Sequence, residues 1–133
     1  MLSVLEKVKE KAKSDRDILA VLVFGSSAFG NSGRDIDLCL VPVKKLSNLA
    51  ASKKRVAYQK ISDKLDVHIL DQLPLYVRKE VISHNQPLII KNEDILTEKA
   101  RLVIKDYGFF EKHYEGYLRS MKDGTGKKAS VED

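Results

Sequence analysis

Two apolar runs joined by a short glycine-rich segment constrain this chain more than any other feature. The runs cover residues 18–24 and 36–41, and their consecutive β-branched and aliphatic side chains predict two buried strands. The segment between them contains Gly25, Gly30 and Gly33. Glycine lets backbone N–H groups approach an anion closely. The sequence therefore predicts a strand–turn–strand unit whose turn can bind phosphate.

Two carboxylates open the second of these strands. Asp35 and Asp37 are separated by one residue, so the alternation of a strand places both on one face. Like charges at that distance repel each other, and both stay ionised when a cation compensates them. Mg²⁺ binds one or two carboxylates together with phosphate oxygens. With Gly25 and the hydroxyl of Ser26 close by, the pair predicts a site for metal and phosphate.

A third acid, Asp66, lies within the apolar run 65–70, which predicts another strand. An unpaired buried carboxylate is costly, so two interpretations of Asp66 stand. It is a third metal ligand that meets Asp35 and Asp37 across adjacent strands, or it is a surface acid on an edge strand. His68 shares its face of the strand, and it either lines the site or is a structural histidine.

These residues resemble the signature of a known superfamily. Gly25-Ser26 followed by Asp35-Ile36-Asp37 is similar to the motif of nucleotidyltransferases related to DNA polymerase β, in their stand-alone minimal nucleotidyltransferase (MNT) form. The loop between Ser26 and Asp35 is shorter than is common in that family. The resemblance implies an α/β, palm-like fold: a small mixed sheet of about four strands with flanking helices, which we expect on one side of it.

The resemblance also implies a reaction, in which AMP moves from ATP to a hydroxyl with two Mg²⁺ ions present. Asp35 and Asp37 would bridge both ions. Asp66 would hold only the ion nearer the attacking hydroxyl and would take the proton of that hydroxyl. Gly25 and Ser26 would hold the triphosphate.

A further implication concerns the acceptor. The expected domain, residues 1–120, leaves little room for an acceptor site of its own. The family is commonly paired with a helical HEPN ribonuclease toxin, which it silences by adenylylating a tyrosine. The chain would then be the antitoxin of the pair.

Apolar and aromatic residues recur at helical spacing after residue 94, and they predict one continuous helical face: Leu96, Val103, Tyr107, Phe110, Tyr114 and Tyr117. This face packs on the chain's own sheet, or it docks a partner protein or a second copy. The alternative function is a non-catalytic antitoxin or binding module that docks through this helix. Such a module has no need of Asp37 and Asp66.

The remaining segments complete a single domain. Further elements are expected as helices over 3–13, with Ser3 as cap, over 44–62 and over 74–83, and as a short edge strand over 87–90. Irregular periodicity suggests either a break in the second helix or a mobile stretch at 52–54. Residues 121–133 have little apolar content, which predicts a disordered tail.

The balance of charge gives a weaker signal. The net charge is +5, and a basic surface attracts polyanions, so a nucleic-acid binder is a third interpretation that predicts salt-sensitive affinity. The lysines are mixed with acids and accompany no nucleic-acid-reading motif, so we do not expect that partner. No run approaches the roughly 18–20 apolar residues of a membrane span, and the charged start is unlike a signal peptide. We therefore expect a cytoplasmic protein.

Overall fold

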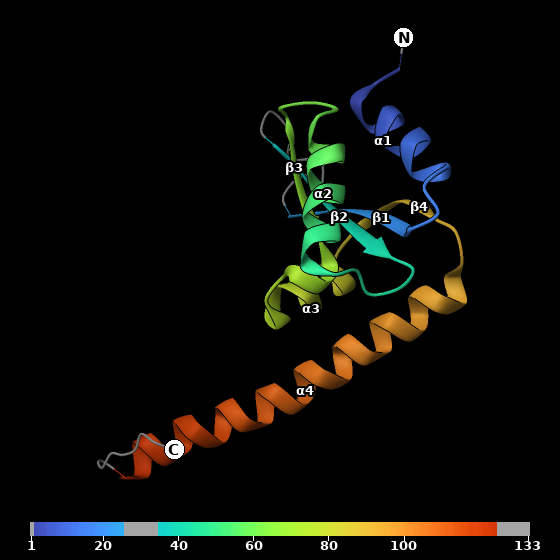
Figure 1. Cartoon of the computed structure of the whole chain (residues 1–133). Helices are drawn as coiled ribbons and strands as arrows, with labels where there is room; N and C mark the ends of the chain where they lie inside the picture. Colours follow the sequence, from blue (N-terminus) through green and yellow to red (C-terminus); the bar gives the residue numbers. More distant parts are fainter. Residues whose placement is uncertain (1, 26–34, 125–133) are drawn as a thin grey trace.

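The computed structural model describes residues 2–25 and 35–124, with side chains described as far as residue 112. A four-stranded mixed sheet with helices packed against it forms the body of the molecule (Figure 1). In chain order the elements are α1 (Val4–Lys13), β1 (Ile18–Phe24), β2 (Ile36–Pro42), α2 (Asn48–Gln59), β3 (Leu65–Ile69), the 3₁₀ turn η2 (Leu70–Gln72), α3 (Leu75–Ser83), β4 (Gln86–Ile90) and α4 (Glu93–Gly124). The expected α/β class is confirmed.

The strand order is β3-β2-β1-β4, so β1 and β2 are central. β1 pairs antiparallel with β2 and with β4, whereas β2 pairs parallel with β3. Almost every residue of β1 is buried, because apolar side chains follow one another on both of its faces. β4 lies at an edge of the sheet, as its sequence predicts.

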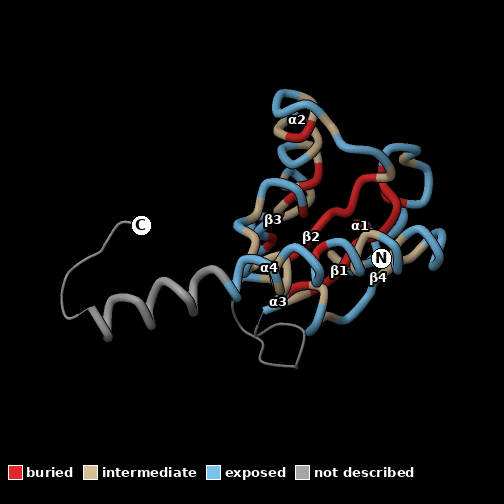
Figure 2. The backbone as a smooth tube through the Cα atoms, turned by 90° about the horizontal axis from the view of Figure 1, so that it is seen from below, coloured by how far each residue is buried: buried red, intermediate tan, exposed pale blue. Residues whose placement is uncertain are grey.

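Helices cover both faces of the sheet, and our expectation of helices on one side is wrong. α1 and α2 pack on one face, where Val8 and Tyr58 join a buried cluster with alternate residues of the strands. η2, α3 and the start of α4 cover the other face around Val81 and Leu96. Figure 2 shows the buried residues concentrated in the strands between these helices. A sheet that is apolar on both faces needs a layer on each side.

α1 begins where its sequence predicts. The Ser3 hydroxyl accepts from the Glu6 N–H at 3.1 Å, and the Glu6 carboxylate accepts from the Ser3 N–H at 2.9 Å. This capping box satisfies two N–H groups that the helix leaves unpaired.

α2 is continuous, so the break expected at 52–54 is wrong. Lys54, within that stretch, is held on the sheet side by Asp15 and Asp17, each with an oxygen 3.0 Å from its Nζ. The Tyr58 hydroxyl donates to Asp15 at 2.9 Å. We call these four residues the Asp15 cluster. It ties α2 to the turn between α1 and β1.

The two carboxylates of the Asp15 cluster share one cation, Lys54. Burial raises the pKa of the Asp15 carboxyl, but hydrogen bonds from Lys54 and Tyr58 outweigh that effect and leave the pKa below its ordinary value. The pKa of Lys54 is raised, because hydrogen bonds and attraction from Asp15 and Asp17 outweigh its burial. Each charge of the cluster therefore has a partner within the chain, and the cluster stabilises the contact between α2 and this turn.

The outer edge of β3 is covered by a side chain. The Gln59 amide oxygen accepts from the Val67 N–H at 3.1 Å, and its amide nitrogen donates to the Leu65 carbonyl. These backbone groups face away from β2. At the opposite edge of the sheet, β4 contains Pro87, which has no N–H to offer.

α4 starts on the body of the molecule and extends away from it (Figure 1). Val103 on its predicted apolar face is buried and Tyr107 is half-buried, whereas Phe110 is exposed. The side chains of Tyr114 and Tyr117 lie outside the described residues. The helix reaches Gly124, so it continues into the segment 121–133 that we expected to be a disordered tail.

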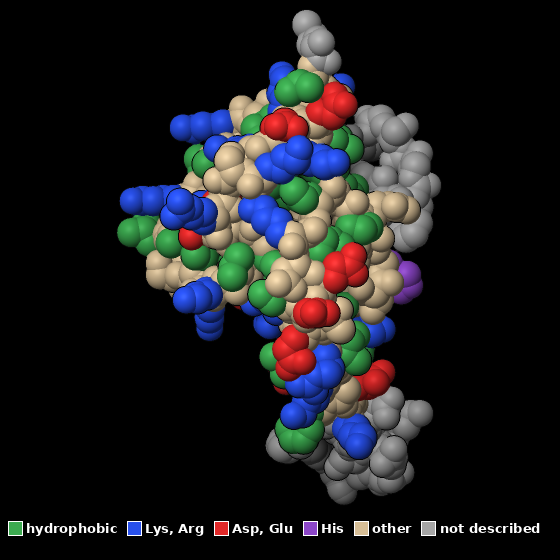
Figure 3. Space-filling model, turned by 90° about the vertical axis from the view of Figure 1, so that its right-hand side faces the viewer, with side chains coloured by type: hydrophobic (Ala, Val, Ile, Leu, Met, Phe, Trp, Pro, Cys, Tyr) green, Lys and Arg blue, Asp and Glu red, His purple; other side chains and the backbone are tan. Residues whose placement is uncertain are grey.

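Two surface properties bear on the expected partners. None of the helices in the described parts has the length and apolar content that a bilayer span requires. On the face shown in Figure 3, lysine and arginine side chains are dispersed among acidic and hydrophobic ones. The basic charge on this face does not form one continuous patch.

Candidate active site

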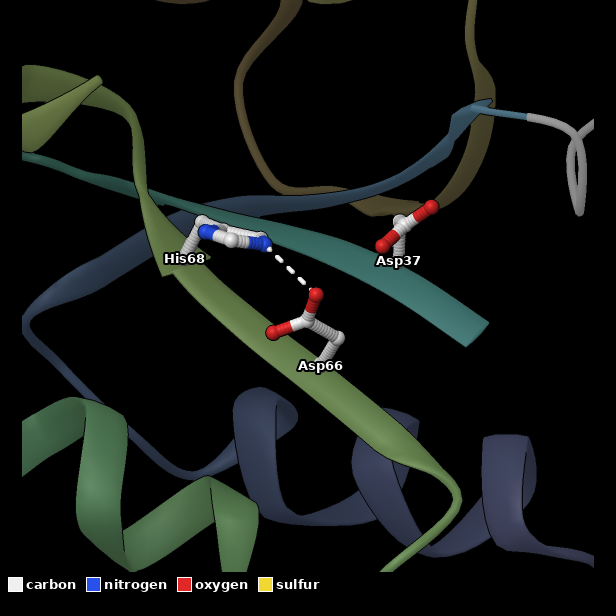
Figure 4. Close-up of side chains that lie close together, drawn as sticks. All are labelled: Asp37, Asp66 and His68. Atoms are coloured by element: carbon white, nitrogen blue, oxygen red, sulfur yellow. Dashed lines mark ion pairs between the residues drawn. The ribbon is translucent and has the colours of Figure 1, made fainter. Parts of the chain in front are cut away.

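Three polar side chains converge at one end of the sheet. Asp37 comes from β2, and Asp66 and His68 come from β3 (Figure 4). One ligand atom from each lies within 4.8 Å of the other two, and no other such group of histidine, cysteine and acidic side chains occurs among the described residues. We call them the Asp37–Asp66–His68 group.

The parallel register of β2 and β3 creates this group. Asp37 stands opposite Asp66 in the ladder, so both carboxylates project from the same face of the sheet. His68 follows at the next position on that face. Cys39, two residues beyond Asp37, is already buried in the cluster under α3, whereas Asp37 is half-buried and Asp66 is exposed. The group therefore lies just outside the region that α3 covers, where a ligand can enter.

Gly25 lies directly against this group. Its φ is +69°, in the left-handed region that favours glycine. A Cβ atom at this position would lie 2.5 Å from Oδ2 of Asp37, closer than atoms can pack. Both the backbone conformation and the close contact therefore require glycine at this position. The start of the predicted phosphate-binding turn thus borders the Asp37 carboxylate. Ser26, the other predicted phosphate ligand, lies outside the described residues.

The electrostatics of the group favour a bound cation. Burial raises the pKa of the Asp37 carboxyl, and the Asp66 and Asp35 carboxylates raise it further, while His68 opposes them. Among the described residues, the ion pair at this group is the one between Asp66 and His68. The carboxylates thus repel each other with little compensation from the part of the chain that is described.

His68 lies in the same group as Asp37 and Asp66, whereas the sequence alone left it either lining the site or structural. Its Nε2 lies 3.2 Å from Oδ2 of Asp66. Its ring meets the ring of Phe24 edge-on, with 5.7 Å between centroids and 63° between planes. The signal in the sequence was its position two residues after Asp66, on the same face of the strand.

Asp35 is placed differently from the other two predicted ligands. It precedes the first residue of β2, its side chain is exposed, and it is not a member of the Asp37–Asp66–His68 group. Its charge nevertheless acts on Asp37. Two of the three predicted carboxylates are therefore brought together, and the third stands at the entrance of the strand.

The donor set fits a divalent metal ion. Two carboxylates and an imidazole supply oxygen and nitrogen ligands, and a bound ion would relieve the repulsion that raises the pKa of Asp37. Gly25 brings the start of the predicted phosphate-binding turn to the same point. The arrangement can therefore hold a metal ion beside the start of that turn.

Comparisons with known proteins identify the family of this chain. Residues 6–94, which include every strand and the whole site, match the family described as "Polymerase beta, Nucleotidyltransferase". A protein of Methanocaldococcus jannaschii named "Putative protein adenylyltransferase MJ1547" is 32% identical over 94 residues, which are 67% of this chain and 71% of that protein.

Solved structures share the fold. The chain is similar to one in a structure of a tri-AMPylated Shewanella oneidensis HEPN toxin in complex with MNT antitoxin, with a TM-score of 0.64, 14% identity and coverage of 89% of this chain and 98% of that one. It is also similar to a chain of a toxin-antitoxin with AMP-PNP, with a TM-score of 0.67, 17% identity and coverage of 90% and 96%. The predicted fold is confirmed, and the family match shows that this chain belongs to the polymerase β nucleotidyltransferase family.

Proposed function

We propose that this chain transfers AMP from ATP to a hydroxyl of a partner protein, with Mg²⁺ as the metal. The observation that carries the proposal is the ladder register that sets Asp37 beside Asp66, next to a glycine whose Cβ would touch Asp37. Family membership supports nucleotidyl transfer. The name of the M. jannaschii relative supports a protein as the acceptor.

The partner we propose is a HEPN-type toxin, with this chain as its antitoxin and a tyrosine as the acceptor. The fold shared with a structure of an AMPylated HEPN toxin and its MNT antitoxin supports this role. Asp66 is exposed and Asp37 and His68 are half-buried, so the described part of the chain leaves room for a tyrosine of another protein at this group.

Each residue of the site has a role in this proposal. Asp37 and Asp66, with Asp35 at the entrance of β2, would hold two Mg²⁺ ions. When bound, the ions acidify the acceptor hydroxyl and neutralise the charge of the departing pyrophosphate. Gly25 and Ser26 bind the triphosphate, so that the α-phosphorus lies in line with the acceptor oxygen.

The bonds change as follows. The acceptor oxygen forms a bond to the α-phosphorus of ATP, and the bond from that phosphorus to the oxygen bridging to the β-phosphate breaks. Pyrophosphate leaves with that electron pair. Asp66 takes the proton of the acceptor hydroxyl. The products are an AMP ester of the partner protein and pyrophosphate.

The test is transfer of label from α-labelled ATP to a HEPN-type toxin in the presence of Mg²⁺. We expect labelling by the natural chain and strongly reduced labelling by Asp37→Asn or Asp66→Asn, because each variant removes a proposed metal ligand. Asp63→Asn, at an exposed acid just before β3, is the matched control and should label normally. Undiminished labelling by Asp37→Asn would overturn the proposal.

A second candidate function, neutralisation by docking alone, has a specific observation in its favour. Three large apolar side chains of α4 are exposed at seven-residue spacing: Ile95 (38%), Leu102 (44%) and Phe109 (67%). Co-expression of Asp37→Asn/Asp66→Asn with an active toxin separates the two candidates. Docking alone predicts that this variant still restores growth, whereas AMP transfer predicts that it does not.

A further inference from the structure

The site differs in one respect from the set of three carboxylates that the sequence motif implies. Within the Asp37–Asp66–His68 group, one of the three donors is an imidazole nitrogen instead of a carboxylate oxygen. Nε2 of His68 points at Asp66, as the dashed line in Figure 4 marks. The group is therefore a mixed nitrogen and oxygen donor set.

The spacing of these donors suits a single ion. Two ligands that bind an octahedral ion at about 2.1 Å and at right angles lie about 3 Å apart. The distance from His68 Nε2 to Asp66 Oδ2 is 3.2 Å. One ligand atom each from Asp37, Asp66 and His68 lie within 4.8 Å of one another. Little rearrangement is needed for the three to share a cation.

The imidazole is also held in its orientation. Val67 and Ile69, on either side of His68, are buried in the core on the opposite face of the sheet, which fixes the backbone beneath the ring. The edge-on contact with Phe24 supports the ring from one side. A ligand that is oriented before the metal arrives loses little conformational freedom on binding.

We propose that His68 Nε2 is a direct metal ligand, so that this site favours a first-row transition metal such as Mn²⁺ over Mg²⁺ more strongly than an all-carboxylate site would. The inference rests on the proposed function, since the same cation would serve AMP transfer. Its chemical basis is that imidazole binds transition metals well, whereas Mg²⁺ prefers oxygen ligands. The competing interpretation is that His68 is a counter-ion of Asp66 and leaves when a metal binds.

Pulsed electron paramagnetic resonance of Mn²⁺ bound to the metal-free protein tests the direct bond. We expect ¹⁴N coupling to Mn²⁺ in the natural chain and none in His68→Gln. His84→Gln is the matched control and should keep the coupling, because His84 forms a similar pair with Glu80 at 3.0 Å on the exposed face of α3. Bound Mn²⁺ without ¹⁴N coupling in the natural chain would overturn the inference, and so would coupling that persists in His68→Gln.

Metal affinity gives a second readout. We expect His68→Gln to weaken Mn²⁺ binding by at least about tenfold and to leave Mg²⁺ binding unchanged. His68→Asp replaces nitrogen by oxygen and should bind Mn²⁺ without ¹⁴N coupling, which keeps the test decisive if His68→Gln does not fold. An equal loss of both metals in His68→Gln would contradict the inference.

The outcomes separate this inference from the proposed function. If the natural chain transfers AMP with Mg²⁺ but bound Mn²⁺ shows no ¹⁴N coupling, AMP transfer stands and the His68 ligand is rejected. If ¹⁴N coupling is present but no partner protein becomes labelled, the metal site stands and AMP transfer is rejected.

Discussion

The Asp15 cluster and the Asp37–Asp66–His68 group are built from similar materials and have opposite electrostatics. Each contains one partly buried carboxylate and one exposed carboxylate next to the sheet. Lys54 and the Tyr58 hydroxyl outweigh the burial of Asp15 and lower its pKa. Burial and neighbouring carboxylates raise the pKa of Asp37. At the Asp15 cluster the chain itself supplies a compensating cation, Lys54. At the Asp37–Asp66–His68 group the described residues supply little more than His68.

The difference distinguishes charges that are paired within the chain from charges that repel one another. A group whose charges are paired within the chain strengthens the fold and has no capacity left to bind anything else. A group whose charges repel each other costs stability until a cation from outside arrives. The two sites should therefore respond in opposite ways to the same kind of substitution.

The largest effect is expected at Asp37. Asp37→Asn should lower the rate of AMP transfer about 10³-fold, which corresponds to about 4 kcal/mol of transition-state stabilisation, because a metal ligand is lost. The same substitution removes a repelling charge, so the free energy of unfolding should not fall. Labelling assays and urea unfolding of the same sample measure both quantities. A marked loss of stability would show that Asp37 is a structural acid like Asp15.

The converse substitution is Asp15→Ala. It should lower the free energy of unfolding by about 1–3 kcal/mol, because it leaves the buried hydroxyl of Tyr58 without its acceptor. AMP transfer per folded molecule should stay unchanged. The double variant Asp15→Ala/Tyr58→Phe should regain part of the loss, since no unpaired hydroxyl remains. Equal stability of the natural chain and Asp15→Ala in urea unfolding would end the contrast between the two sites.

Two glycines allow a smaller and sharper comparison. Gly25→Ala should destabilise the protein by about 1–2 kcal/mol, because alanine disfavours the left-handed conformation and its Cβ would collide with Asp37. In Gly108→Ala the new Cβ meets nothing within 4 Å, so a gain of about 0.5–1 kcal/mol is expected from higher helix propensity. Thermal unfolding of both variants measures the difference. Changes of the same sign would contradict the assignment of Gly25 as a constrained site residue.

The smallest effect expected is the acid dependence of stability. The pKa of Asp15 is lower in the folded protein than its ordinary value of 3.8. Its contribution to stability is therefore fully present above that value and is lost as the pH falls through the folded pKa. Urea unfolding between about pH 7 and pH 3 should show a shallower acid loss for Asp15→Asn than for the natural chain. Identical slopes would mean that Lys54 and Tyr58 do not stabilise the ionised form.

Local sequence patterns predicted most elements of the fold. Unbroken apolar runs fixed β1 and the body of β2, and Ser3 marked the start of α1, because these signals depend on nearby residues alone. The side on which helices pack depends on long-range contacts, and there the prediction was wrong. α2 is continuous where its periodicity suggested a break, since Lys54 is held by Asp15 and Asp17, which lie far away in the sequence.

The site was predictable in its residue types and less so in its geometry. Asp37 and Asp66 were expected to meet, but alternation within one strand cannot reveal which residue of a neighbouring strand lies opposite. The parallel register of β2 and β3 decides that. The same register brings His68 into the group, while Asp35 remains one position before the strand. The catalytic and binding roles of the five predicted site residues stay predictions.

Gln59 has a consequence for how this chain can meet other proteins. Sheets with an open border tend to recruit a further strand, which leads either to strand-addition complexes or to aggregation. At the β3 edge, the Gln59 amide already hydrogen-bonds the Leu65 carbonyl and the Val67 N–H. At the β4 edge, Pro87 has no N–H to offer to a further strand. Growth of the sheet is thus disfavoured on both sides, which directs recognition of other chains to the helical surfaces and the exposed end of the strands.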